Sequence, residues 1–215
     1  MATSIRPARP ADASFLAWVM LAASRSHVRR GAWDLHVDRP EPDVLAFLER
    51  MAAQPEPSFC RWPGFLVAEV DGTPAAGLCG YTTRDPGMHD PTPAITAASK
   101  GVLGWGNADL AAAGGRLAPF LTCVTEPSPG TWAVEWVATR PEFRRRGLVH
   151  ELLLAAMEVG RARGFLQSQI LVLIGNTAAQ CAYERAGYEV VGEKRHPEFA
   201  RVIDCPGIAQ LTRTL

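Results

Sequence analysis

The sequence predicts an α/β fold in which helices flank a central, mixed and twisted sheet. A strand–helix–strand pattern runs through residues 132–173, and such a unit forms a right-handed parallel crossover. A hairpin is predicted around Asp71 and Gly72, and two β-rich segments, 188–195 and 208–215, close the chain. Because hairpins pair antiparallel and crossovers pair parallel, the sheet must contain both directions.

The first eighty residues predict a strand, two helices and the hairpin. Residues 3–8 have the composition of a short strand, and Asp12 is a helix start signal within the stretch 10–27. A second helix is predicted over 41–53, and Pro55 ends it. Two β-rich runs within 64–82 flank the Asp-Gly pair, which favours a tight turn.

Residues 84–131 differ from the rest of the chain because they are rich in proline and glycine. We expect an irregular insertion there, with an alanine-rich helix near 94–113. This segment either covers a substrate or forms a disordered surface loop. Neither repeats nor a linker divides the sequence, so we expect one domain over residues 1–215.

The second half contains the clearest elements. Residues 131–139 predict a strand, 147–164 a helix that stops at Gly164, 168–175 a buried strand and 176–187 a short helix. The apolar residues expected along the inner side of the long helix are Leu148, Leu152, Ala155, Ala156 and Val159.

Composition excludes several classes of protein. The 215 residues carry 22 Lys+Arg and 22 Asp+Glu, so there is no basic excess for nucleic acid. No apolar run reaches the ~18 residues of a membrane span, and the N-terminus lacks a secretory pattern. Five scattered cysteines suggest reduced core thiols in a cytoplasmic protein, with no metal cluster. His27, His36, His89 and His196 do not cluster either and are expected on the surface or in loops.

Three arginines, Arg144, Arg145 and Arg146, precede Gly147 where the strand-to-helix loop becomes the long helix. The first turn of a helix offers free N–H groups and a positive dipole end, and glycine lets a ligand approach the backbone. These features suit a phosphate. A solvated basic turn has the same sequence, so the loop alone leaves both interpretations open.

The surrounding motifs resemble the GNAT superfamily of N-acetyltransferases. In that family, a Gln or Arg, two residues, a Gly, one residue and then a Gly or Ala form the acyl-coenzyme A signature. Arg144 and Gly147 match it, whereas Val149 replaces the small residue and narrows the approach of the pyrophosphate. Residues 173–192 resemble the second motif, with an Asn, a Tyr and a Gly-Tyr pair. The resemblance is strong over 132–194, moderate over 1–80 and absent from the insertion.

The resemblance implies acetyl-coenzyme A as cosubstrate and no metal. Backbone groups of one strand end would pair with the pantetheine arm, and the amides from Arg145 to His150 would hold the pyrophosphate. Residues of the next loop and helix would line the slot. The expected binding residues are Val137, Ala138, Thr139, Arg144, Arg145, Arg146, Gly147, Leu148, Val149, His150, Asn176, Ala179, Ala182 and Tyr183.

Two residues are candidate catalytic groups. Glu135 is a lone carboxylate in an apolar strand and would act as the base, through a water. Tyr183 would place its hydroxyl near the thioester sulfur and act as the acid. Alternatively, Glu135 pairs with an arginine or lies on a solvated face, and Tyr183 is a core tyrosine. Asn176 is placed to cap the following helix, and Trp105, Trp132 and Trp136 suit packing.

The sequence therefore predicts an N-acetyltransferase that moves an acetyl group from acetyl-coenzyme A to a primary amine by direct attack. The acceptor, a small molecule or peptide, would bind between the N-terminal helices and the insertion. The acidic residues that could attract it there are Asp85, Asp90, Asp109 and Glu126. Alternatives are a non-catalytic acyl-coenzyme A sensor, an interaction domain, transfer of a longer acyl group, or transfer to a protein N-terminus. Family analogy suggests a homodimer.

Overall fold

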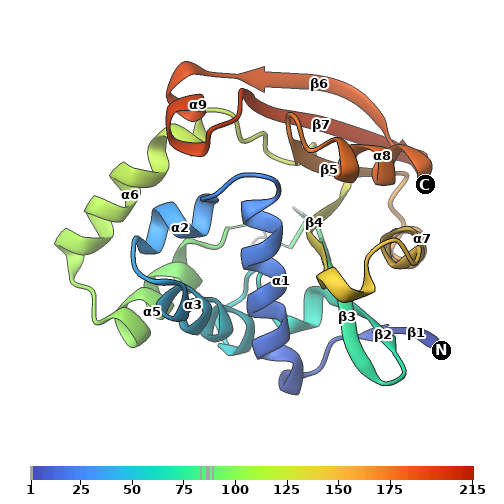
Figure 1. Ribbon diagram of the computed structural model, residues 1–215, viewed down its shortest axis with the longest axis horizontal. Coiled ribbons are helices and arrows are strands. Elements are labelled where there is room, and N and C mark those ends of the chain that lie inside the picture. The colour runs from blue at the N-terminus through green and yellow to red at the C-terminus, as the bar shows by residue number, and fades with distance from the viewer. Residues whose placement is uncertain (1, 83, 86–87, 89) are drawn as a thin grey trace.

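The computed structural model describes residues 2–82, 84–85, 88 and 90–215. Over these ranges the strands form one seven-stranded sheet in the order β1-β2-β3-β4-β5-β7-β6 (Figure 1). The strands are β1 (Thr3–Pro7), β2 (Phe65–Val70), β3 (Thr73–Tyr81), β4 (Trp132–Thr139), β5 (Gln167–Leu173), β6 (Glu189–Arg195) and β7 (Gly207–Thr214). Only β4 and β5 pair parallel among them, so the predicted mixed sheet is confirmed.

The hairpin between β2 and β3 follows from its turn residues. Asp71 has φ 50° and Gly72 has φ 79°, two consecutive left-handed residues of the kind that a primed hairpin turn requires. Asp-Gly is among the pairs that tolerate this geometry best. The turn lets β1, β2 and β3 form an antiparallel unit beside β4.

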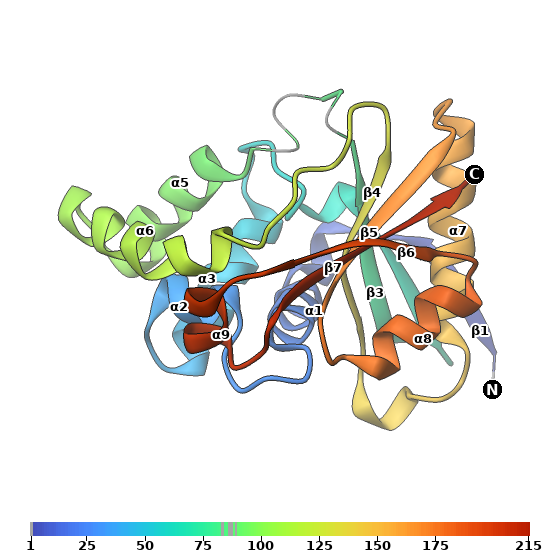
Figure 2. The same ribbon diagram turned by 90° about the horizontal axis from the view of Figure 1, so that it is seen from above.

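Helices cover both faces of the sheet (Figure 2). On one face lie α1 (Ala13–Arg25), α2 (Ala32–Val37) and α3 (Glu41–Ala53). On the other face α7 (Leu148–Ala162) packs across β1 to β4, with α8 (Thr177–Arg185) beside it. The crossover from β4 to β5 therefore passes through α7, as predicted.

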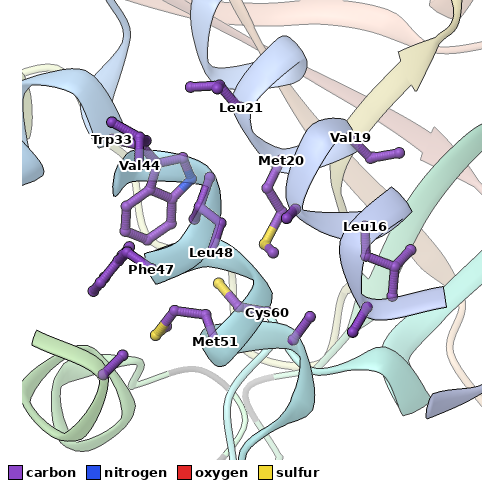
Figure 3. Packing of buried hydrophobic residues seen from close by; sticks show 14 of the residues in the cluster. Leu16, Val19, Met20, Leu21, Trp33, Val44, Phe47, Leu48, Met51 and Cys60 are labelled. Atoms are coloured by element: carbon purple, nitrogen blue, oxygen red, sulfur yellow. The ribbon is translucent and has the colours of Figure 1, made fainter. Parts of the chain in front are cut away.

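The core beneath α1 and α3 consists mainly of apolar side chains (Figure 3). Leu16 and Met20 from α1 meet Phe47, Leu48 and Met51 from α3, and each is completely buried. Each such side chain contributes ~1.5–3 kcal/mol on burial. The apolar side chains of α1 and α3 therefore lie on the sides of the two helices that face each other.

Residues 92–121 are helical, in contrast to the irregular insertion expected over 84–131. They form α5 (Thr92–Leu103) and α6 (Asn107–Leu121), where one helix was expected near 94–113. Gly104 separates them, because at φ 69° it ends α5 in a left-handed conformation. Alanine-rich sequence favours helix more strongly than Gly114, Gly115 and Pro119, which lie within α6, oppose it. Two short helices were also missed, α2 and α9 (Pro197–Ile203).

The buried side of α7 is rotated from the predicted one. Leu148, Leu152 and Ala156 are buried as expected, but Val159 is 39% exposed. Leu153 and Met157 are buried instead, and Gly160 lies against the ring of Trp132. Because α7 spans four strands, its contact face is wider than a single apolar stripe.

The cysteines are free in this structure. Cys60, Cys79, Cys123 and Cys205 are buried as predicted, whereas Cys181 lies exposed on α8. Among the described residues, no helix is both long and apolar enough to cross a bilayer.

Candidate functional site

The sheet opens into a fork between its two parallel strands. β4 and β5 pair only from Trp132 to Val134, opposite Ser168 to Ile170. Beyond this point β4 continues to Thr139 without a partner on that edge, while β5 stays paired with β7. The fork leaves backbone N–H and C=O groups of β4 open to a ligand.

A β-bulge lies at the base of the fork. Trp136 has φ 54°, and the register with β3 shifts so that Cys79 faces Glu135 while Gly77 faces Ala138. Three steps along β4 therefore match two along β3, which places one extra residue in β4.

Glu135 lies on the α1 side of this bulge. It is partly exposed, and no described residue forms a hydrogen bond or ion pair with it. Burial raises its pKa to about 7, because little water remains to solvate the charge. Neither the predicted arginine partner nor a solvated face explains this residue.

Tyr183 approaches the fork from the other side. It lies on α8, only 6% exposed, within the core cluster beneath α7. Burial raises its pKa, and the negative charge of Glu135 raises it further. The structure therefore brings the two candidate catalytic residues into electrostatic range of each other, one from β4 and one from α8.

The loop after β4 has the geometry expected of an anion site. Arg145 has φ 61° and Gly147 has φ 80°, and α7 begins directly afterwards without a side-chain cap. A Cβ atom added to Gly147 would meet nothing within 4 Å, so the space beside this backbone is open. The first amides of α7 are consequently available to an acidic ligand.

The arginine side chains of this loop are exposed and bind parts of the loop itself. Arg144 donates from Nε to the carbonyl of Thr139 at 3.4 Å. Arg146 donates to the carbonyl of Glu142 and lies 5.3 Å over the Phe143 ring.

Val149 packs its side chain against the core cluster beneath α7 and is partly buried. The branched side chain at this position therefore belongs to the packing of the helix. His150 is exposed one residue further along α7.

Asn176 is the N-cap of α8, and both the oxygen and the nitrogen of its side-chain amide form hydrogen bonds. Its Oδ1 accepts a hydrogen bond from the Ala179 N–H at 3.1 Å, so the predicted helix cap is confirmed. Its Nδ2 donates to the Ser26 hydroxyl at 2.5 Å. Ala179 and Ala182 are partly buried on the side of α8 that carries Tyr183.

An aromatic wall lines the α1 side near Glu135; it consists of Trp33, Phe59, Tyr81 and Trp136. Phe59 stacks on Tyr81 at 4.7 Å and on Trp136 at 5.9 Å, and Trp33 lies 5.4 Å from Trp136. Phe59 and Trp136 are its partly exposed members. Sequence reasoning missed this wall, because its rings come from four separate segments with no local pattern.

His36 is buried, contrary to the expectation of a surface or loop histidine. Its ring lies among Trp33, Phe47 and Trp105, and Nε2 is 3.3 Å from the Ser99 hydroxyl. Burial, aided by a neighbouring arginine, lowers its pKa to about 4. His36 is therefore neutral at physiological pH. His89 lies outside the described residues.

Three of the four acidic residues expected to attract an amine make local contacts, and the fourth, Glu126, is exposed and within electrostatic range of Tyr81. Asp85 forms an ion pair with Arg163 at 3.3 Å. Asp90 and Asp109 accept hydrogen bonds from backbone N–H groups where α5 and α6 begin. In the parts of the chain that are described, no His, Cys, Asp or Glu cluster could hold a metal.

Two surface hollows lie elsewhere. One is lined by Trp105, Arg39 and Arg116, whose guanidinium groups already bind backbone carbonyls, and the other is lined by residues around Arg213. Neither is lined by a residue of the fork.

Comparison with known proteins agrees with this geometry. The model of the acetyltransferase (GNAT) family matches residues 31–188. A solved acetyltransferase is 20% identical, with 98% of each chain covered and a TM-score of 0.69. An N-acetyltransferase from Staphylococcus aureus Mu50 is 19% identical over 98% of this chain and 100% of its own, with a TM-score of 0.70.

A third solved structure, an aminoglycoside acetyltransferase in complex with coenzyme A, is 16% identical, with 99% of this chain and 95% of its own covered and a TM-score of 0.54. These likenesses show the fold alone. No curated protein matches the sequence. The family model covers most of the chain, and the chain therefore belongs to the acetyltransferase (GNAT) family of acyltransferases, which take their acyl group from coenzyme A.

Proposed function

We propose that the protein is an N-acetyltransferase that moves the acetyl group of acetyl-coenzyme A to a primary amine by direct attack within a ternary complex. The observation that carries this proposal is the fork, where a carboxylate without a partner among the described residues and a buried phenol lie within electrostatic range across an open strand edge. A thioester between these two groups would have a base on one side and a proton donor on the other.

The residues around the fork fit coenzyme A. The open edge of Val137, Ala138 and Thr139 offers backbone groups to the amides of the pantetheine arm. The uncapped start of α7 after Gly147 offers N–H groups to the pyrophosphate. The small side chains of Ala179 and Ala182 leave room beside this path.

Glu135 is the proposed base. An alkyl amine titrates near ~10 and is mostly protonated at neutral pH, so it must lose a proton before it attacks. A carboxylate with a pKa of about 7 is half ionised near neutrality and takes up a proton more readily than an ordinary glutamate. A water between amine and carboxylate is the proposed carrier.

Tyr183 is the proposed proton donor to the leaving thiolate. A thiol of this kind has a pKa of about 8.5, so the thiolate leaves more easily when a hydrogen bond stabilises it. Because burial raises the pKa of Tyr183, its hydroxyl stays protonated across the working range. No described residue hydrogen-bonds to that hydroxyl, which leaves it free to face the sulfur.

The aromatic wall supports an acceptor with one amine beside an apolar body. Phe59 and Trp136 offer ring faces next to Glu135, and Glu126 lies within electrostatic range of Tyr81 in the same wall. Ring faces attract both apolar groups and a single cation. Asp85, Asp90 and Asp109 already bind an arginine or a backbone N–H group, so the ring faces, more than an array of acids, argue for a monoamine.

The first test is a thermal shift with acetyl-coenzyme A, followed by thiol release with a panel of amines. A shift with turnover supports the enzyme, and arylalkyl monoamines should outperform spermidine. A shift without turnover on any amine would indicate a sensor. Faster turnover with longer acyl-coenzyme A donors would show that the preferred donor carries a longer acyl group. Without a shift or turnover, the proposal fails.

By analogy with the family we further propose a homodimer in the cytoplasm. Five free cysteines support a reducing compartment. Light scattering across a concentration series tests the dimer, and fractionation of the source cells tests the location.

A further inference from the structure

A hydrogen bond joins two loops on opposite sides of the fork. Ser26 follows α1, and Asn176 precedes α8, with 150 residues between them in sequence. The Asn176 Nδ2 lies 2.5 Å from the Ser26 hydroxyl oxygen. Figure 2 shows the loop after α1 close to the loop between β5 and α8.

The orientation of the Asn176 amide is fixed by chemistry. Its Oδ1 faces the backbone N–H of Ala179, which can only donate, so the oxygen must lie there. The nitrogen therefore faces Ser26. An amide nitrogen carries two hydrogens, and one remains after the bond to Ser26.

Ser26 holds a backbone conformation that serine rarely adopts. Its φ is 54° and its ψ is −110°, at the end of α1. Glycine reaches this region without the steric cost that a Cβ atom brings. Strain of this kind persists where the surrounding structure requires it, and it gathers at functional sites.

A second contact supports the same junction. Gly175 has φ 102°, and the His27 ring covers it so closely that an added Cβ would lie 3.1 Å from Nε2. The residues after α1 thus rest on both Gly175 and Asn176. Since α1 packs on β4 and α8 follows β5, the junction connects the two diverging strands.

We propose that Ser26 is a positioning residue for coenzyme A. Its hydroxyl holds the Asn176 amide so that the remaining N–H faces the slot, and the bond sets the spacing of the fork. This inference rests on the proposed function, because it assumes that coenzyme A enters between β4 and β5.

The test is calorimetric titration of the full-length protein with coenzyme A. Ser26→Ala removes the hydroxyl but keeps the Cβ, and Ser26→Gly removes both. Loss of one such hydrogen bond should raise the Kd about 2- to 10-fold in each variant. Ser26→Gly should be no less stable than Ser26→Ala, because it relieves the backbone. The KM for acetyl-coenzyme A should rise while kcat changes little.

Two further variants make the result specific. Ser14→Ala removes an exposed hydroxyl from α1 and should change nothing. Asn176→Ser keeps a helix-capping oxygen but cannot reach Ser26, so adding Ser26→Ala to it should have little further effect. If the double variant raised the Kd by the product of the two single effects, the two residues would act independently and the inference would be contradicted.

The two failures are distinguishable. If the wild-type protein does not bind coenzyme A, the proposed function fails. If the wild type binds and Ser26→Ala binds equally well, only the positioning role fails, even when the variant melts at a lower temperature.

Discussion

Cys79 on β3 lies opposite Glu135 on β4, and its thiol donates away from that carboxylate, to the carbonyl of Phe59 at 2.9 Å. Burial and the nearby negative charges raise the pKa of Cys79, so it remains a neutral thiol. Glu135 therefore has a neighbour that neither neutralises its charge nor competes for protons near neutral pH. Its ionisation is governed by burial.

The pH dependence of turnover should report Glu135. Because its ionised form is the base, kcat/KM should rise with pH and level off above a midpoint of about 7. Glu135→Gln should lose this limb and about 10²- to 10⁴-fold in kcat. Initial rates from pH 5.5 to 9, with saturating acetyl-coenzyme A and the acceptor below its KM, test this; an unchanged pH dependence in the variant would assign the base elsewhere.

The same variant should be more stable than the wild type at high pH. A raised pKa favours the protonated carboxyl, so its contribution is fully present below the unfolded pKa and is lost as pH rises to about 7. Partial exposure limits the effect to ~1–3 kcal/mol. Urea unfolding at pH 5 and pH 8.5 measures it, with Glu49→Gln, exposed on α3, as the control.

Replacing Tyr183 by Phe should lower kcat at least ~100-fold and leave the affinity for coenzyme A unchanged. The fold should survive, because no described residue bonds to the Tyr183 hydroxyl. The matched control is Tyr188→Phe, whose hydroxyl lies 2.7 Å from Ser168 in the core. It should cost ~1 kcal/mol of stability with kcat intact. Equal kcat losses in the two variants would assign Tyr183 to packing.

Gly147→Leu should weaken coenzyme A binding at least ~10-fold, since a side chain there would fill the open approach to the first amides of α7. Gly104→Leu is its control. Both positions are left-handed, at φ 80° and φ 69°, and both have open space around the Cβ. Each variant pays ~1–2 kcal/mol of backbone strain, but only Gly147→Leu should change the coenzyme Kd.

Trp136→Leu should raise the acceptor KM without altering the Kd for coenzyme A. The substitution removes the ring that stacks on Phe59 beside Glu135 and keeps an apolar side chain. Steady-state kinetics with an arylalkyl monoamine and a simple alkylamine separate the effects, because the loss should be larger for the aromatic acceptor. An equal rise in KM for both acceptors would indicate that the substitution disturbs the fork itself.

Local sequence patterns predicted the part of the fold that forms the fork. The strand around Glu135, the long helix after Gly147 and the Asn176 cap depend on contacts within a few residues, so periodicity and capping chemistry reveal them. The Asp71-Gly72 turn is similar, since two left-handed residues must be adjacent in sequence.

The remaining features depend on contacts between distant segments. Phe59, Tyr81 and Trp136 meet only after β3, β4 and the loop between α3 and β2 have assembled. The burial of His36 requires α5 and α6, whose helical state was hidden by the glycines and prolines around them. Ser26 and Asn176 are 150 residues apart in sequence, and no local pattern around either residue predicts their hydrogen bond.

The bulge at Trp136 also interrupts the alternation of side chains between the two faces of the sheet along β4. Val134 packs on the α7 side, and regular alternation would send Val137 to the opposite side, yet Val137 packs there too. Ala138 and the Trp136 ring belong to the α1 side. If Trp136 took up a regular extended conformation, the strand from Val137 to Thr139 would turn over, exchanging what each face of the sheet presents. Deletion of this one residue would instead restore regular alternation and leave both faces unchanged.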